Sequence, residues 1–441
     1  MTIRHRAALV LCCAAAGLLA PARDAALALT PAQIEIGSRR APVSVRETTT
    51  RLASDAFLGR DNLTEGSEIA QAYLIPLLRA LGAGADGGTS DESYKHRFAQ
   101  GTNLIAVIPG RELPDEYVLI GGHYDHLGVA SSGEVFNGAT DNATGTAIAI
   151  AVGRAIRALP EAPRRSVVIA LWDAEEDGLL GSIAWVGQPT IPIEQIVAYV
   201  NLDIQGANLT PTLARTSIAV GAETGGQILE DVVANAVQSE LRAFPRGVET
   251  LPVSYIFGQL RSDYATLVGA SVPTVFFSDS TGACYHTVRD DTRFVDFDKA
   301  ASQSRIAFRT TVTLAEAESV PAFVAPNPNL AVFADAVTLD AIFTRSARDL
   351  ARFDPEDRQR VQRVVEDVAA IVARGPEAFG PADVTTVLAA AVDTLGAIES
   401  SFGCAGYFGR TSPFEVPRDG AHQHGQRRPR TGGTLPRDIA R

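Results

Sequence analysis

Hydrophobic and polar positions alternate along residues 45–315 in a pattern typical of strands followed by helices. Continuous apolar runs, typical of strands that are buried on both faces, occupy residues 103–109, 117–121, 166–172, 196–202 and 272–277. Apolar residues at helical spacing occupy residues 70–81, 146–159 and 226–241. Because strands that alternate with helices of this length form βαβ units, the pattern predicts an α/β fold: a mostly parallel, mixed sheet with helices on both faces.

A different pattern follows this α/β region. Apolar residues recur every three or four positions over residues 361–372 and 384–398, and residues 330–353 are a third candidate helix. Such amphipathic helices predict a C-terminal α-helical extension over residues 319–405, whose apolar faces pack on each other, on the main domain or on an unknown partner. Residues 406–441 are rich in Gly, Pro, Arg and His, which predicts a disordered tail.

The first 28 residues have the pattern of a secretory signal. Arg4 and Arg6 precede an apolar run over residues 7–20, and small residues suited to cleavage follow. This run is too short for a comfortable membrane span, and no later stretch looks long and apolar enough. The sequence therefore predicts a protein that is secreted or periplasmic, without a stable membrane span, and a main domain over residues 29–318.

Composition narrows the choice of partners. The formal net charge is −12, which disfavours binding to nucleic acid because phosphates need a basic face. The chain has only four cysteines, too few for a disulfide framework in a chain of 441 residues. Cys12 and Cys13 belong to the predicted signal, and the sequence leaves open whether Cys284 and Cys404 pair.

Histidines and carboxylates gather just beyond the predicted strands. Taken singly, each has an ordinary structural explanation, such as a helix N-cap or a buried histidine bonded to a carboxylate. Taken together, they lie at the carboxyl edge of the predicted sheet, where open α/β sheets form their sites. These residues are His123, Asp125, Asp141, Glu175, Glu176, Asp203 and His286.

Five of them form a donor set that suits zinc, and cobalt or manganese would also fit: His123, Asp141, Glu176, Asp203 and His286. A single catalytic zinc uses three protein ligands, so five predict two ions that share one carboxylate, for which Asp141 is the choice. Asp125 lies two residues after His123 and can bond its ring. Glu175 is expected to take the proton of the activated water, which predicts metal-assisted hydrolysis of an amide or related bond.

The same motifs resemble the secreted di-zinc aminopeptidases, a metallopeptidase family that also contains glutamate carboxypeptidases and glutaminyl cyclases. The matching segments are LASDAFLGR at 52–60, HYDH at 123–126, GATDNATG at 138–145, DAEEDG at 173–178, NLDIQG at 201–206, RSDY at 261–264 and YHT at 285–287. In two respects the chain departs from the family pattern. Residues 81–103 are too few for the protease-associated insert that members often carry, and Tyr264 stands where the family often has His.

The resemblance implies a zinc-peptidase-like fold and a role for each residue. His123 and Asp203 would bind one zinc, Glu176 and His286 the other, and Asp141 would bridge them. Glu175 would be the general base and Asp125 the partner of His123, while Tyr255 or Tyr285 would donate to the oxyanion.

The function that the resemblance implies is an aminopeptidase that acts on peptide substrates. Two alternatives stay open: a glutaminyl cyclase-like enzyme with a single zinc, and a non-catalytic binding module on a hydrolase scaffold. One metal ion per chain would favour the cyclase, and a missing ligand would favour the binding module. No ligand is missing from the sequence.

Overall fold

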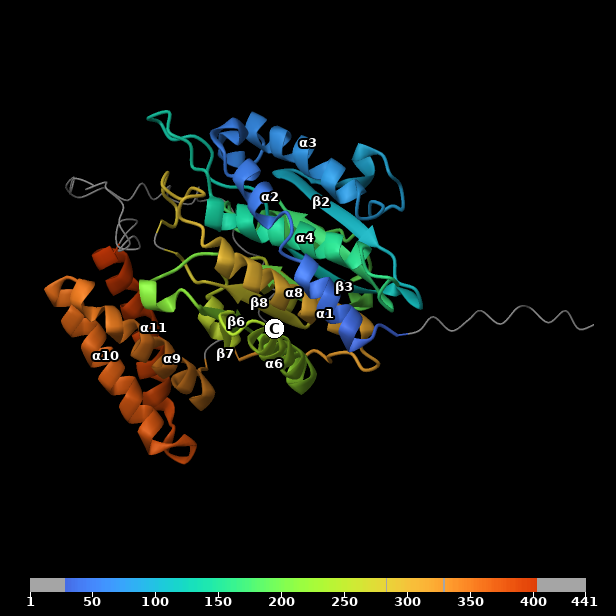
Figure 1. Cartoon of the computed structure of the whole chain (residues 1–441). Helices are drawn as coiled ribbons and strands as arrows, with labels where there is room; N and C mark the ends of the chain where they lie inside the picture. Colours follow the sequence, from blue (N-terminus) through green and yellow to red (C-terminus); the bar gives the residue numbers. More distant parts are fainter. Residues whose placement is uncertain (1–27, 283, 328–329, 403–441) are drawn as a thin grey trace, which may run out of the picture.

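A mixed sheet of eight strands, surrounded by helices, forms the main body of the molecule (Figure 1). The computed structural model describes residues 28–282, 284–327 and 330–402. The strands are β1 (Lys95–Phe98), β2 (Gly101–Ile108), β3 (Leu113–His123), β4 (Arg165–Trp172), β5 (Ile196–Leu202), β6 (Thr216–Val220), β7 (Glu249–Val253) and β8 (Thr274–Ser278). The α-helices are α1 (Pro31–Arg40), α2 (Val45–Leu52), α3 (Glu65–Arg79), α4 (Thr144–Arg157), α5 (Leu180–Gly187), α6 (Gly226–Ala243), α7 (Tyr264–Gly269), α8 (Phe297–Glu316), α9 (Phe333–Ser346), α10 (Pro355–Arg374) and α11 (Pro381–Phe402).

The order of the strands is β1-β2-β4-β3-β5-β8-β6-β7. The four central strands, β4, β3, β5 and β8, run parallel to their neighbours in this group. β2 is antiparallel to β4 at one side, and β6 is antiparallel to β8 at the other. The predicted fold class, a mostly parallel mixed sheet, is thus confirmed, and the central strands all end at one edge.

Helices cover both faces of the sheet, because neighbouring residues of each central strand point to opposite sides. In β4, Ile169 and Leu171 belong to the large apolar cluster that includes residues of α4 and α8. Val168 and Ala170 point the other way and pack in the cluster that contains Trp185 of α5 and Leu267 of α7. Residues of β4 are buried along its whole length, which explains the uninterrupted apolar run from Val167 to Trp172.

The predicted elements coincide with observed ones, with differences at some boundaries. The helix expected over residues 70–81 is α3, which begins earlier, at Glu65. The sequence pattern did not predict the three strands β1, β6 and β7. They have four or five residues each, and β7 contains Pro252, so their sequences lack the long apolar run that marks the central strands.

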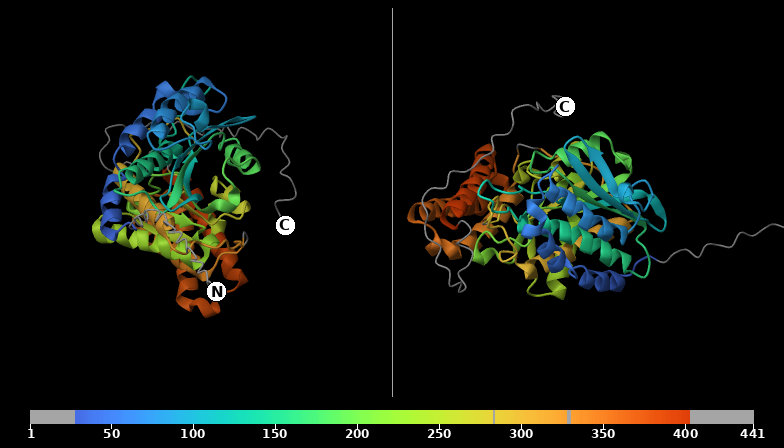
Figure 2. Two further views of the ribbon diagram at one scale, coloured as in Figure 1. Left: turned by 90° about the vertical axis from the view of Figure 1, so that its right-hand side faces the viewer. Right: turned by 90° about the horizontal axis from the view of Figure 1, so that it is seen from above.

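The C-terminal α-helical extension is also present. α9, α10 and α11 share their own apolar cluster, which includes Phe343, Val368 and Val387. They stand together beyond the β6–β7 side of the sheet (Figure 1), and the further views show them at one end of the molecule (Figure 2). The exact boundaries at residues 318 and 405 stay predictions, and the predicted signal and tail lie almost entirely outside the described residues.

One expectation about apolar stretches was wrong. Within the described residues, the segment Pro381–Ile398 of α11 is long and apolar enough, by length and composition, to cross a membrane, and 28% of it is buried. A single helix of this kind is weak evidence for a membrane span. Val387 and Ala390 of this segment pack against α9 and α10 in the extension's own cluster.

Candidate metal centre

The predicted ligands come together at the carboxyl edge of the parallel strands. His123 is the last residue of β3, and Asp203 directly follows β5. Glu176 lies in the turn after β4, Asp141 in the turn before α4, and His286 in the loop after β8. Because β4, β3, β5 and β8 are neighbours, these turns converge on one point.

Asp141 lies between two groups of ligand atoms. Its Oδ1 is 3.3 Å from His123 Nε2, which is also 3.3 Å from Asp203 Oδ1. Its Oδ2 is 3.2 Å from His286 Nε2, which is 2.9 Å from Glu176 Oε2. Ligand bonds of about 2.1 Å at tetrahedral angles put neighbouring ligand atoms about 3.4 Å apart. The distances among His123, Asp141 and Asp203 fit that spacing. The distances among His286, Asp141 and Glu176 are slightly shorter than that spacing.

The chemistry of the residues also fits a metal. Oδ2 of Asp141 is buried, and within the described part of the chain it has no hydrogen-bond partner, although His286 lies close. Burial acts to raise the pKa of Asp141, but His123 and His286 outweigh it and hold this pKa well below its usual value. An ionised, buried carboxylate with an unpaired oxygen is suited to bind a cation.

Two residues hold Asp141 in this position. Asp290 accepts hydrogen bonds from the backbone nitrogens of Thr140 and Asp141, each at 3.0 Å. Asn142 donates to the carbonyl of Leu202 at the end of β5, at 2.8 Å. A side chain at Gly145 would come within 2.1 Å of the Asn142 amide oxygen, so the tight turn requires glycine there. The turn is thereby fixed to both β5 and the loop that carries His286.

The side chains of Glu175 and Glu176 contact different neighbours. Glu176 contacts His286, whereas Glu175 lines the neighbouring cavity, with its Oε2 3.9 Å from His123 Nε2. Burial, together with Asp203 and the adjacent Glu176, raises the pKa of Glu175 well above its usual value. A carboxyl group with a raised pKa beside the ligands has the properties of a general base.

Asp125 and His126 surround the ligands. The carboxylate of Asp125 is 3.4 Å from His123 Nδ1, and its other oxygen accepts a hydrogen bond from the backbone of Glu176. His126 Nδ1 is 2.6 Å from Glu176 Oε1, a hydrogen-bond distance that is too short for two ligands of one ion. By proximity alone, three groups of the described residues could hold a metal ion: His123, Asp141 and Asp203; His123, Glu175 and Glu176; and His126, Asp141 and Glu176.

The loop between His123 and Asp141 is held by a buried arginine. Arg60 donates to the carbonyls of Leu52, Tyr124, Asn137 and Gly138 at 2.7–3.1 Å, and its side chain is fully buried. Burial lowers the pKa of Arg60 to about 10, although nearby carboxylates such as Asp125 oppose the shift. The guanidinium therefore stays charged and joins both ends of this loop.

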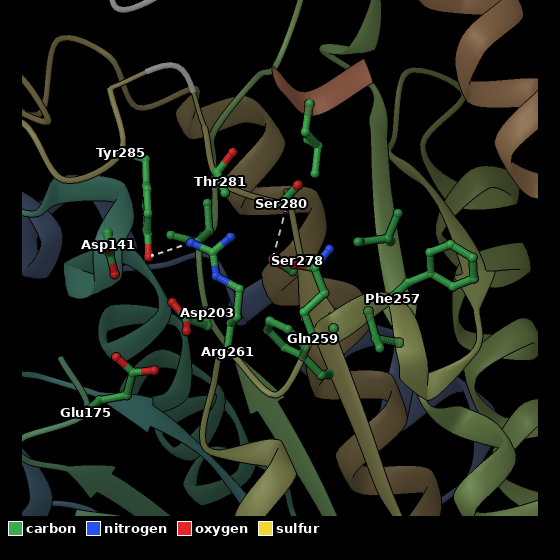
Figure 3. A pocket seen from close by; sticks show the side chains of 16 residues that line it. Asp141, Glu175, Asp203, Phe257, Gln259, Arg261, Ser278, Ser280, Thr281 and Tyr285 are labelled. Carbon is green, nitrogen blue, oxygen red and sulfur yellow. Dashed lines mark hydrogen bonds between the residues drawn. The ribbon is translucent and has the colours of Figure 1, made fainter. Parts of the chain in front are cut away.

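A cavity that is open to solvent adjoins the proposed ligands, and Asp141, Glu175 and Asp203 line it (Figure 3). Tyr285 also lines it, and its hydroxyl accepts a hydrogen bond from Arg261 at 3.2 Å. Tyr255, the other tyrosine considered, belongs to an apolar cluster with Tyr264 and is not among the residues that line this cavity.

No role was predicted from the sequence for Arg60, His126 or Asp290, although all three stand within or beside the motifs that resemble the family. Each acts through contacts with residues far along the chain: Arg60 with Gly138, His126 with Glu176, and Asp290 with Thr140. The only signal for these three residues in the sequence was their place at the end of a motif or shortly after one. The sequence left the pairing of Cys284 open. Cys284 is disulfide-bonded, but Cys404 lies outside the described residues.

Part of the chain matches known proteins. Residues 103–311 match the model of peptidase family M28. The chain is 30% identical over 237 residues to "Probable glutamate carboxypeptidase LAMP1" of Arabidopsis thaliana, which covers 50% of this chain and 33% of that protein. It is 35% identical over 108 residues to "Aminopeptidase NAALADL1" of Mus musculus, which covers 23% of this chain and 13% of that protein. The chain thus spans a third or less of the length of these two relatives.

Among solved structures, the Legionella pneumophila LapA aminopeptidase matches with a TM-score of 0.51 and 18% identity, over 66% of this chain and 78% of that chain. At this identity the match shows a shared fold. The family resemblance that the motifs suggested is confirmed by the family match, which covers every proposed metal ligand. The part of the chain from residue 103 to residue 311 belongs to peptidase family M28.

Proposed function

We propose that this chain is a zinc-dependent aminopeptidase that hydrolyses the N-terminal peptide bond of its substrates. The observation that carries the proposal is the position of Asp141, whose two carboxylate oxygens each lie near a different histidine, while each of these histidines also contacts a different second carboxylate. Such an arrangement suits two ions that share one bridging ligand. This arrangement favours a two-metal hydrolase over a cyclase with one zinc. All five proposed ligands are present, whereas a degenerate scaffold would tend to lose some of them.

We assign His123 and Asp203 to one zinc, His286 and Glu176 to the other, and Asp141 to both. The chemistry that bound zinc supplies is polarisation of a carbonyl and activation of a water molecule near neutral pH. Asp125 orients His123 through Nδ1, and His126 holds Glu176 through a hydrogen bond. These contacts leave Nε2 of His123 and Oε2 of Glu176 directed toward the proposed ions.

Glu175 acts as the general base in this proposal. It faces the cavity, is next to a ligand in sequence, and has a raised pKa because it is buried among other carboxylates. Glu175 accepts a proton from the attacking water and transfers it to the amine that leaves. Tyr285 is placed to donate its hydroxyl proton to the developing oxyanion, because Arg261 already supplies the hydrogen bond that this oxygen accepts.

A second candidate is a carboxypeptidase. Arg261 lines the same cavity, and a guanidinium there could bind the terminal carboxylate of a peptide. The cavity is also lined by Glu175, a carboxylate that is not assigned to zinc and that favours a free amine. The choice between the two functions is made by blocking one end of the substrate. An aminopeptidase loses activity when the N-terminus of a dipeptide is acetylated, whereas a carboxypeptidase loses it when the C-terminus is amidated.

Removal of metal should abolish the activity. The purified protein is expected to hydrolyse leucine p-nitroanilide, to lose at least 90% of that rate after dialysis against a chelator, and to regain it when zinc is added. Magnesium serves as the control ion, because its preference for an octahedral set of oxygen ligands does not match these histidines. Full activity in protein that is shown to be free of metal would contradict the proposal.

We also propose that the protein is exported, as its N-terminal pattern predicts. The support is the sequence alone: a basic start, an apolar run and small residues suited to cleavage within residues 1–28. N-terminal sequencing of protein recovered from the producing cells would test it, since an exported protein should begin after the predicted signal.

A further inference from the structure

The cavity beside the proposed metal centre has an apolar end as well as a charged one. The apolar end is formed by Ile218, Val220, Phe257, Phe276 and Leu395. Figure 3 shows Phe257 on the opposite side of the cavity from Asp141 and Glu175. When the bond to be cleaved lies at the carboxylates, a neighbouring group of the substrate therefore reaches the apolar end.

Two strands form the floor of the apolar end. Val220 of β6 lies opposite Phe276 of β8, and Ile218 lies opposite Ser278. Residues two apart on a strand share a face, so both pairs point into the same side of the sheet. Val220 and Phe276 are buried, which makes this floor a fixed part of the core.

The remaining apolar wall comes from the C-terminal extension. Leu395 belongs to α11, and Phe257, in the turn after β7, packs against both the cluster of the extension and the cluster of the main domain. The extension is firmly attached beside this point. Asp335 of α9 accepts hydrogen bonds from the backbone and the hydroxyl of Ser254, at 2.7 and 2.8 Å, and Thr338 donates to the carbonyl of Pro252.

We propose that Leu395 makes the extension part of the substrate-binding site and limits the size of the apolar side chain that the cavity accepts. This inference rests on the proposed function and adds a substrate class to it: peptides whose residue beside the cleaved bond has a medium-sized apolar side chain, such as leucine. The wall formed by Leu395 is attached through α9 rather than through a mobile loop, so it sets an upper limit of size.

Variants at this position give the test. In Leu395→Ala the cavity lengthens, and the ratio of kcat/KM for phenylalanine p-nitroanilide to that for leucine p-nitroanilide should rise about tenfold. In Leu395→Phe the cavity shortens, and the same ratio should fall by a similar factor. The larger variant adds apolar volume, so it tests the inference even if the alanine variant folds poorly.

Val392→Ala is the matched control, because Val392 lies on the same helix and is 58% exposed. It should leave the ratio within twofold of the wild type. The inference is overturned if both Leu395 variants fold, as thermal unfolding shows, and yet keep the wild-type ratio.

A binding experiment separates this inference from the proposed function. Isothermal titration of the zinc-loaded protein with leucine hydroxamate and phenylalanine hydroxamate measures side-chain preference without turnover. If no aminoacyl amide is hydrolysed, the aminopeptidase proposal fails, but the ratio of the two hydroxamate affinities should still change with Leu395 in the directions given above. An affinity ratio that is the same in the wild type and in both Leu395 variants would reject the role of Leu395.

Discussion

Glu175→Gln is expected to lower kcat by a factor of about 10²–10⁴, while the zinc content of the protein stays unchanged. The amide keeps the size of the carboxyl group but cannot accept a proton from water. Glu175 lines the cavity and does not make the close contacts of 3.3 Å or less that join the five proposed ligands, so its loss should spare the metals. Steady-state kinetics on leucine p-nitroanilide and elemental analysis of the same sample measure both effects.

Asp177→Asn provides the control for this variant. Asp177 lies two residues further along the same turn, is exposed, and accepts a hydrogen bond from Asn62. Its replacement should change kcat by less than twofold. An active Glu175→Gln variant would show that another group takes the proton, and loss of zinc from it would show that Glu175 is a ligand.

Arg60→Met should destabilise the protein by about 3–5 kcal/mol, because it leaves a set of buried carbonyls without their donor. The hydrogen bonds from this guanidinium to the carbonyls of Leu52, Tyr124 and Gly138 are buried, and the one to the carbonyl of Asn137 is partly buried. Arg60→Lys should recover part of the loss, since an ammonium keeps the charge but lacks the planar fork. Urea denaturation followed by circular dichroism gives the free energy of unfolding for each variant.

Arg40→Met is a matched control for Arg60→Met. Arg40 also donates to a backbone carbonyl, that of Ala158, but this contact is exposed. Its replacement should cost less than about 1 kcal/mol. If Arg60→Met costs no more than Arg40→Met, then the buried guanidinium does not hold the loop between His123 and Asp141, and its proposed role is wrong.

The sequence predicted the central sheet well because the central strands are buried on both faces. β4 has an uninterrupted apolar run from Val167 to Trp172 and β5 has one from Ile196 to Val200, so length and composition were enough to find them. β6 and β7 lie at one side of the sheet, are short, and mix polar residues with apolar ones. β6 is positioned by pairing with β8 and β7 by pairing with β6, contacts that no local pattern in the chain reveals.

The proposed ligands could be predicted for a related reason. Each lies at the end of a central strand or in the turn or loop that follows one, so the topology of the sheet brings them to one edge. Arg60 and Asp290 could not be assigned in this way. Their function comes from hydrogen bonds to backbone groups 64–78 and 149–150 residues distant, and such contacts follow from the packed structure rather than from spacing.

The position of Leu395 beside the cavity also could not be predicted from the sequence. Apolar periodicity predicted that α11 would be amphipathic, but it did not show which apolar residue would turn toward the cavity. That placement follows from the attachment of α9 to the turn after β7, through Asp335 and Ser254. An extension that carried no recognisable motif therefore contributes to the cavity beside the ligands.

Anomalous scattering at the zinc edge, from crystals of the zinc-loaded protein, would show how many ions bind and where they lie. The bridging role proposed for Asp141 predicts two peaks about 3.5–4 Å apart, one on each side of its carboxylate. His123 and Asp203 should border the first peak, with His286 and Glu176 around the second. A single peak, or a pair of peaks away from Asp141, would contradict it.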